Sequence, residues 1–175
     1  ILNRPRLRRL VDLFTRAGLH YIEGGHLAGR TGGNWSATTF SLSVVNQPAT
    51  SPQGYAYLVQ IADQLMEEIH RQGWASRWIQ HAADEPIACN AADYRILTGM
   101  IHKHFPGIRV LDALGDTSLA GAPSDWCPQV QDVQRNLQAY EQYRKLGDRL
   151  WYYTCCFPGG AWLNRLLDQE LLRPV

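Results

Sequence analysis

Hydrophobic positions repeat along the chain with two periods, one typical of helices and one typical of strands. After Pro5, apolar residues recur at helical spacing and stop at Gly18, which predicts a capped amphipathic helix. Its apolar face consists of Leu7, Leu10, Val11 and Phe14. Helices of this kind are expected over 5–18, 51–73, 91–104, 130–147 and 162–171.

Short apolar runs between the helices have the character of strands. We expect them at 20–25, 77–82, 108–113, 125–128 and 150–155, the fourth being very short. Residues 26–50 are rich in Gly, Ser, Thr and Asn and are predicted to form a long loop. Helices and strands alternate, which predicts an α/β fold with parallel strands, either an open doubly wound sheet or a (β/α) barrel.

Polar residues gather just after the predicted strands, where a (β/α) barrel assembles its active site. They are Glu23 and His26, Asp84 and Glu85, Asp112, Asp125 and Trp126, and Thr154. Neither phosphate-cradling pattern, GxGxxG or GxxxxGK[ST], occurs in the sequence, which weakens the case for a nucleotide-binding sheet. Four or five strands are too few for a closed eight-stranded barrel, so we interpret residues 1–175 as part of a (β/α)8 TIM-barrel type domain, an incomplete barrel fragment.

Composition and charge narrow the possible functions. The chain has 175 residues, 45% of them apolar and 19% charged, which predicts one globular unit. A formal net charge of +1 gives no broad field for nucleic acid or an anionic membrane. No stretch predicts a membrane span or a signal peptide. The four cysteines form no CxxC pair, so no metal or other cofactor is expected, and the missing initiator Met indicates a processed product or an excerpt from a longer polypeptide.

The candidate chemistry centres on the consecutive carboxylates Asp84 and Glu85, followed by Pro86. Neighbours on a regular strand point to opposite faces, so the pair can share a pocket only where the strand has ended. Two carboxylates held close cannot both ionise freely, which suits one acid and one anion. On one side of a sugar they suit a 2-acetamido substrate whose own carbonyl oxygen attacks the anomeric carbon. The tripeptide alone also fits a helix N-terminus that carries two acids.

Longer blocks of sequence carry a resemblance. They are WIQHAADEP at 78–86, PGI at 106–108 followed by LDA at 111–113, DWCPQ at 125–129, LWYYTCC at 150–156 and WLNRLLDQ at 162–169. Together they resemble the catalytic domain of glycoside hydrolase family 123. The resemblance implies a retaining β-N-acetylgalactosaminidase that works by substrate-assisted catalysis on a (β/α)8 barrel, with flanking β-sandwich domains in the parent chain. Asp84 would orient the acetamido group, and Glu85 would be the general acid/base.

Other strand-end residues are candidates for substrate binding. Glu23 and His26 are placed to recognise sugar hydroxyls, together with Asp112. Trp126 could stack on a sugar face or belong to the core. Tyr152 and Tyr153 lie on opposite strand faces, so at most one of them is expected to reach the site.

Two rival functions remain open at this point. A metal-dependent hydrolase would use His26, His81, Asp84, Glu85 and Asp112, although no compact ligand motif supports it. A noncatalytic relative would keep the carbohydrate pocket without turnover. The expected partner is a glycan or glycoconjugate that carries a 2-acetamido sugar, and such a hydrolase favours a secreted or periplasmic location. The missing barrel strands or flanking domains of the parent chain are further expected partners.

Overall fold

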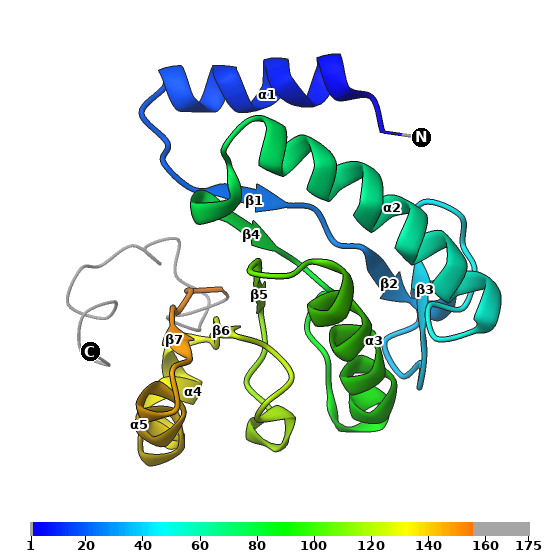
Figure 1. Ribbon diagram of the computed structural model, residues 1–175. Helices are drawn as coiled ribbons and strands as arrows, with labels where there is room; N and C mark the ends of the chain where they lie inside the picture. Colours follow the sequence, from blue (N-terminus) through cyan, green and yellow to red (C-terminus); the bar gives the residue numbers. More distant parts are fainter. Residues whose placement is uncertain (1, 156–175) are drawn as a thin grey trace, which may run out of the picture.

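Five short parallel strands lie side by side in chain order in a computed structural model that describes residues 2–155 (Figure 1). They are β1 (Ile22–Gly24), β4 (Trp78–Gln80), β5 (Arg109–Asp112), β6 (Asp125–Trp126) and β7 (Arg149–Leu150). Each strand pairs in parallel with the next one along the chain. The predicted α/β class with a mainly parallel sheet is therefore confirmed, with strands shorter than the sequence pattern suggested.

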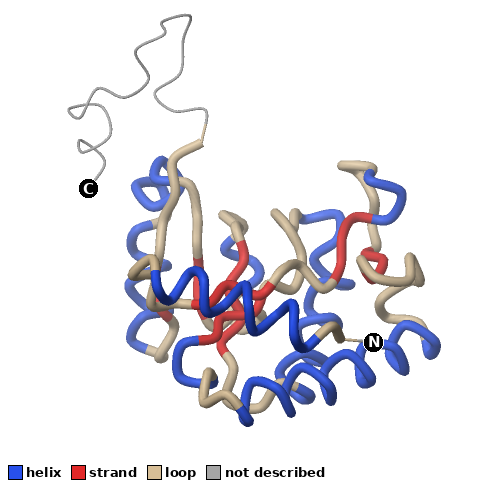
Figure 2. Tube along the Cα trace, turned by 90° about the horizontal axis from the view of Figure 1, so that it is seen from above, coloured by secondary structure: helices blue, strands red, loops and turns tan. Residues whose placement is uncertain are grey.

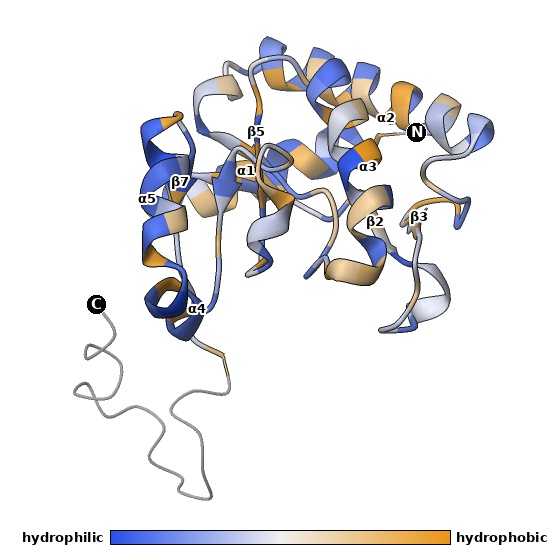
Figure 3. Ribbon diagram, turned by 90° about the horizontal axis from the view of Figure 1, so that it is seen from below, coloured by the Kyte–Doolittle hydropathy of each residue, from blue (hydrophilic) through white to orange (hydrophobic). Residues whose placement is uncertain are grey.

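Helices follow or precede these strands and surround them (Figure 2). They are α1 (Arg4–Arg16), α2 (Pro52–Arg71), α3 (Ala91–His104), α4 (Val130–Arg135) and α5 (Leu137–Lys145), with 3-10 turns η2 (Ala75–Arg77), η3 (Ala88–Asn90) and η4 (Thr117–Leu119). The hydroxyl of Ser51 accepts from the backbone N–H of Gly54 and caps α2. Hydrophobic and hydrophilic residues alternate along α2 and α5 (Figure 3). Among the described helices, none combines the length and apolarity that crossing a bilayer requires.

Two predictions for individual segments were wrong. Residues 26–50 contain an antiparallel hairpin, β2 (Ala28–Arg30) and β3 (Phe40–Leu42), joined through the 3-10 turn η1 (Thr31–Gly33). The hairpin forms because Phe40 and Leu42 are buried, and because the Asp93 carboxylate accepts from the Phe40 backbone N–H at 2.7 Å. The helix expected over 130–147 is divided at Asn136, whose backbone leaves the helical region.

The core lies between α2, α3 and the sheet. The predicted apolar face of α2 is largely buried through Leu58, Ala62, Leu65 and Ile69. Helix α1 is attached to α2 by the fully buried Glu68, whose carboxylate accepts from Arg8 and Arg4. The predicted helix at 162–171 and Cys156 lie outside the described residues.

Candidate functional site

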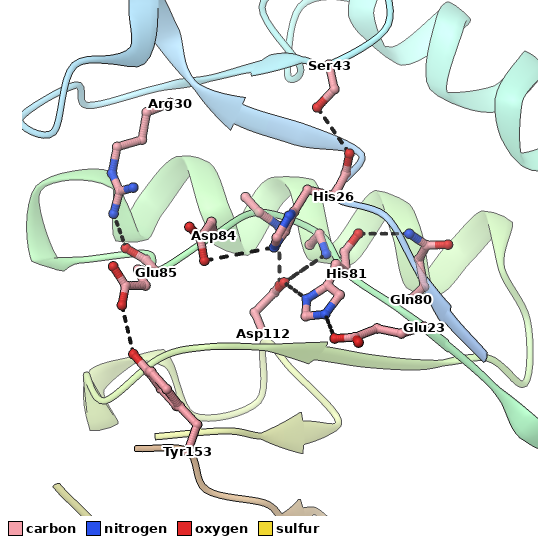
Figure 4. A network of polar contacts seen from close by, with 12 residues as sticks. Glu23, His26, Arg30, Ser43, Gln80, His81, Asp84, Glu85, Asp112 and Tyr153 are labelled. Atoms are coloured by element: carbon pink, nitrogen blue, oxygen red, sulfur yellow. Dashed lines mark hydrogen bonds and ion pairs between the residues drawn. The ribbon is translucent and has the colours of Figure 1, made fainter. Parts of the chain in front are cut away.

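The chain leaves β4 at Gln80 and turns before it reaches the two consecutive carboxylates. Glu85 has a φ of 42°, in the left-handed region that residues with a side chain rarely occupy. A guanidinium N–H of Arg30, from β2, donates to the backbone carbonyl of Glu85 and holds this turn (Figure 4). Strain of about 1–3 kcal/mol at such a residue persists only where the surroundings impose it, and it is characteristic of functional sites.

Within residues 2–155, the side chain of Glu85 has one hydrogen-bond partner. The hydroxyl of Tyr153 donates to its Oε1 at 2.7 Å (Figure 4). This contact lies at the edge of the sheet where the parallel strands end, which we call the mouth. Burial and the hydrogen bond to Glu85 raise the pKa of Tyr153 to about 12, so the phenol remains a donor at neutral pH. Glu85 also lines a cavity of about 430 Å³ together with Trp35 and Tyr153.

Asp84 faces a different neighbour. Its Oδ1 lies 3.9 Å from Nε2 of His26, and its side chain is 59% exposed. The His26 ring in turn lies against the ring of His81, with the two centroids 4.5 Å apart. Asp84 is not among the residues that line the cavity beside Glu85. The two carboxylates therefore have separate neighbours, with Asp84 beside His26 and Glu85 beside Tyr153 (Figure 4).

Asp112 is a fully buried anchor under this turn. Four groups donate to its carboxylate: Nδ1 of His81 at 2.9 Å, the hydroxyl of Tyr94 at 2.7 Å, and the backbone N–H groups of Ala82 and Ala83 at 3.1 and 3.3 Å. Ala82 and Ala83 immediately precede Asp84. Asp112 therefore fixes the backbone that presents the two acids, and its burial keeps it from direct contact with a ligand.

His81 lies between two carboxylates. Its Nδ1 bonds to Asp112, and its Nε2 bonds to Glu23 of β1 (Figure 4). Burial lowers the pKa of His81, but the hydrogen bonds to Asp112 and Glu23 outweigh it and raise that pKa to about 9. For the Asp112 carboxyl group, burial raises the pKa, and the hydrogen bonds from His81 and Tyr94 oppose this rise. We therefore describe His81 as an imidazolium that donates from both nitrogens.

The same cluster bears on the metal hypothesis. Ligand-type atoms of His26, His81 and Asp112 lie within 4.8 Å of one another. However, a metal-bound histidine needs a free lone pair, and both nitrogens of His81 are engaged with carboxylates. A metal at this cluster would have to replace the contact between His81 and Asp112, while the contact between His81 and Glu23 could remain.

The remaining candidates separate by strand face. Tyr153 contacts Glu85, whereas Tyr152 lies with Leu137 of α5 and Leu150 of β7. Of the two alternatives for Trp126, a sugar platform or a core residue, the structure shows the core residue, because Trp126 is 1% exposed and stacks on Tyr143 of α5. Its indole N–H donates to Asp148, which fixes it in the layer between sheet and helix.

Two residues at the site were not expected from the sequence. Arg30 and Trp35 both come from the segment 26–50 that was predicted to be a loop, and the Arg30 guanidinium carbon lies 3.9 Å from the centroid of the Trp35 ring. The only sequence feature that could have indicated them is the apolar pair Phe40 and Leu42, which marks a second strand in that segment.

Comparisons with known proteins indicate the family of this chain. The family model described as glycoside hydrolase 123, catalytic domain, matches residues 33–174. A similar solved structure is that of a family 123 glycoside hydrolase from Clostridium perfringens, studied for glycolipid glycan hydrolysis. It superposes with a TM-score of 0.54 at 14% sequence identity, over 80% of this chain and 26% of the other, so this chain spans about a quarter of that protein. A search of curated proteins gives no match.

Proposed function

The chain belongs to the glycoside hydrolase 123 catalytic-domain family, and on that premise we propose that it cleaves terminal β-linked N-acetylgalactosamine with retention of configuration. The observation that carries the proposal is the turn after β4, where a left-handed Glu85 follows Asp84 and each acid has its own neighbour. A turn of this kind allows two consecutive side chains to point to the same side, which a regular strand does not.

In the proposed reaction the substrate supplies its own nucleophile. The carbonyl oxygen of the 2-acetamido group attacks the anomeric carbon while the glycosidic C–O bond breaks, and Glu85 gives its proton to the leaving oxygen. Asp84 accepts a hydrogen bond from the acetamido N–H and stabilises the positive oxazolinium ring. Glu85 then takes a proton from water as that water attacks the same carbon, and the ring opens to the acetamido sugar. Two inversions give net retention.

Individual residues support the two halves of this scheme. Tyr153 holds the Glu85 carboxylate with a hydroxyl that stays protonated, so the acid/base group has a fixed position. His26 and Glu23 lie at the Asp84 side, where they are proposed to bind hydroxyls of the sugar. His81 and Asp112 act through others, since they hold Glu23 and the backbone before Asp84.

We further propose that residues 1–175 are part of a (β/α)8 barrel catalytic domain. A doubly wound sheet reverses its strand order at a switch point, whereas the five parallel strands here follow chain order without reversal. Glu23, Asp112 and the Asp84 turn all lie at the carboxyl ends of these strands, the active face of such barrels. The parent protein is proposed to supply the remaining strands and flanking domains.

The proposal is tested with the full-length protein and an aryl β-N-acetylgalactosaminide. We expect release of the aryl group by the wild type, and at least about a 100-fold lower kcat in Glu85→Gln, the size of a lost general acid/base. Retained binding of N-acetylgalactosamine by Glu85→Gln would show that the variant is folded. Gln142→Glu, an exposed change of the opposite sense on α5, serves as a control.

Two outcomes would favour the rival functions. Loss of release after chelation, with recovery on adding a divalent metal, would support a metal-dependent hydrolase. Binding of the sugar by the wild type without any release would support a noncatalytic carbohydrate-binding relative. Release of the aryl N-acetylglucosaminide in preference to the galactosaminide would keep the mechanism and change the sugar.

A further inference from the structure

The cavity beside Glu85 has a composition of its own. Its volume is about 430 Å³, within the range of about 300–1,000 Å³ typical of small-molecule sites. Apolar groups of Trp35, Pro86, Ile87 and Leu114 form one part of the lining. Glu85, Asp116, Gln129, Asp132 and Tyr153 form the polar part. An apolar wall with hydrogen-bond acceptors around it suits a ring that has C–H patches and hydroxyl groups.

Trp35 is held in place and yet uncovered. The Arg30 guanidinium stacks over its ring at 3.9 Å, while the residue as a whole remains 55% exposed. The same guanidinium donates to the backbone carbonyl of Glu85. Arg30 therefore ties the indole to the Glu85 turn, and Trp35 lines the cavity. A fixed, exposed indole next to an acid is a platform on which a sugar ring can stack.

The charge of the lining selects the kind of ligand. Glu85, Asp116 and Asp132 bring three carboxylates to the cavity, and no Lys or Arg is among its lining residues in the described part of the chain. Arg135 pairs with Asp132 at 3.0 Å from outside the lining, so an anionic group placed here would meet the charges of Glu85 and Asp116 with no cation among the described lining residues. Gly115 allows this arrangement, because a Cβ there would lie 2.7 Å from Oδ2 of Asp132. The cavity therefore favours a neutral ligand rich in hydroxyl donors.

We propose that this cavity is the subsite for the leaving group and that it binds a neutral sugar stacked on Trp35. The inference rests on the proposed function, in which Glu85 protonates the leaving oxygen. The group attached to that oxygen must then lie beside Glu85, while the sugar that carries the acetamido group lies beside Asp84. Trp35 and Asp116 thus determine which glycans are cleaved, and the Asp84 side determines which terminal sugar is removed.

The test compares two substrates of the full-length protein that share the same terminal sugar. One is a disaccharide with β-linked N-acetylgalactosamine on a neutral hexose, and the other is the β-fluoride of N-acetylgalactosamine, whose leaving group has no ring. In Trp35→Ala we expect the ratio of kcat/KM for disaccharide over fluoride to fall about tenfold, mainly through KM, the loss expected for one aromatic platform. Trp35→Phe should restore most of the ratio.

Two further comparisons test whether the effect is specific to Trp35 and to a neutral leaving group. Tyr57→Ala removes another exposed aromatic side chain, on α2, and should leave the ratio unchanged. A disaccharide with a sulfate on the leaving hexose should be cleaved less well than the neutral one. Asp116→Asn should reduce this discrimination, since an amide removes the charge and keeps an oxygen for the backbone N–H of Ser118.

Three results would overturn the inference. They are unchanged kcat/KM values for both substrates in Trp35→Ala, an equal loss with both substrates that leaves the ratio unchanged, and a preference for the sulfated disaccharide. If the wild type cleaves neither substrate, the proposed function fails separately. Calorimetric binding of the uncleaved disaccharide then decides the inference, with tighter binding by the wild type than by Trp35→Ala supporting it and equal binding overturning it.

Discussion

Removal of the Asp112 carboxylate is expected to be among the most damaging single changes in the described part of the chain. Asp112→Ala leaves the His81 imidazolium with one carboxylate in place of two, and leaves three other donors without their acceptor. Breaking a buried ion pair by removing one partner costs about 3–5 kcal/mol. Because small domains are stable by only about 5–15 kcal/mol, this is a large share of the total.

The measurement is urea unfolding followed by circular dichroism and tryptophan fluorescence. Asp112→Ala should lower the free energy of unfolding by about 3 kcal/mol or more, whereas Asp12→Ala, on the exposed side of α1, should change it by less than about 0.5 kcal/mol. A double-mutant cycle with His81→Leu isolates the pair. The double mutant should lose less free energy of unfolding than the sum of the losses in the two single mutants, by at least about 1 kcal/mol.

Two results would refute this reasoning. A loss in Asp112→Ala no larger than that in Asp12→Ala would mean that the network contributes nothing to stability. Strict additivity in the cycle would mean that His81 and Asp112 are not coupled, in spite of the 2.9 Å contact between them.

Three further predictions concern Tyr153, His81 and Glu68. Tyr153→Phe removes the donor to Glu85 and should lower kcat/KM on an aryl glycoside about tenfold, which corresponds to about one hydrogen bond. An unchanged kcat/KM would show that this contact does not contribute to catalysis. The pKa of His81 rises from 6.5 to about 9 on folding. Protonated His81 therefore contributes at most about 3 kcal/mol to the free energy of unfolding, and this contribution is complete below pH 6.5 and is lost as the pH rises through 9. The urea midpoint should therefore fall over that interval in the wild type and fall less in His81→Gln, and parallel curves would contradict the assignment. Glu68→Ala should speed amide hydrogen exchange throughout α1, because Arg4 and Arg8 lose their shared acceptor, while Asp63→Ala on the exposed face of α2 should not.

The parallel sheet was predictable because it depends on local periodicity. Apolar runs of period two between amphipathic segments give strands joined by helices, and parallel pairing follows from those connections. The hairpin at 28–42 was not predictable by the same means, because Gly, Ser and Thr conceal Phe40 and Leu42. Its stability comes from burial and from Asp93, a residue more than 50 positions away.

The position of the acids followed from sequence, but the roles of their neighbours did not. Pro86 and strand alternation place Asp84 and Glu85 beyond the end of β4. Asp112 was expected at the mouth, and it does end β5, but its donors come from the β4 turn and from α3, so its burial depends on tertiary packing. Because neighbouring side chains on a strand point to opposite faces, only one of Tyr152 and Tyr153 can point toward Glu85. The register of β7 against β6 decides which of the two it is.

The proposed mechanism depends most on the identity of the nucleophile that attacks the sugar. The direct test measures kcat/KM of the full-length protein on aryl β-N-acetylgalactosaminides whose acetyl group carries no, one, two or three fluorine atoms. Each fluorine weakens the carbonyl oxygen as a nucleophile, so the account predicts a steep, regular fall in rate along the series. A rate that hardly changes would mean that an enzyme side chain or a water molecule attacks directly, and would contradict the proposed roles of Asp84 and Glu85.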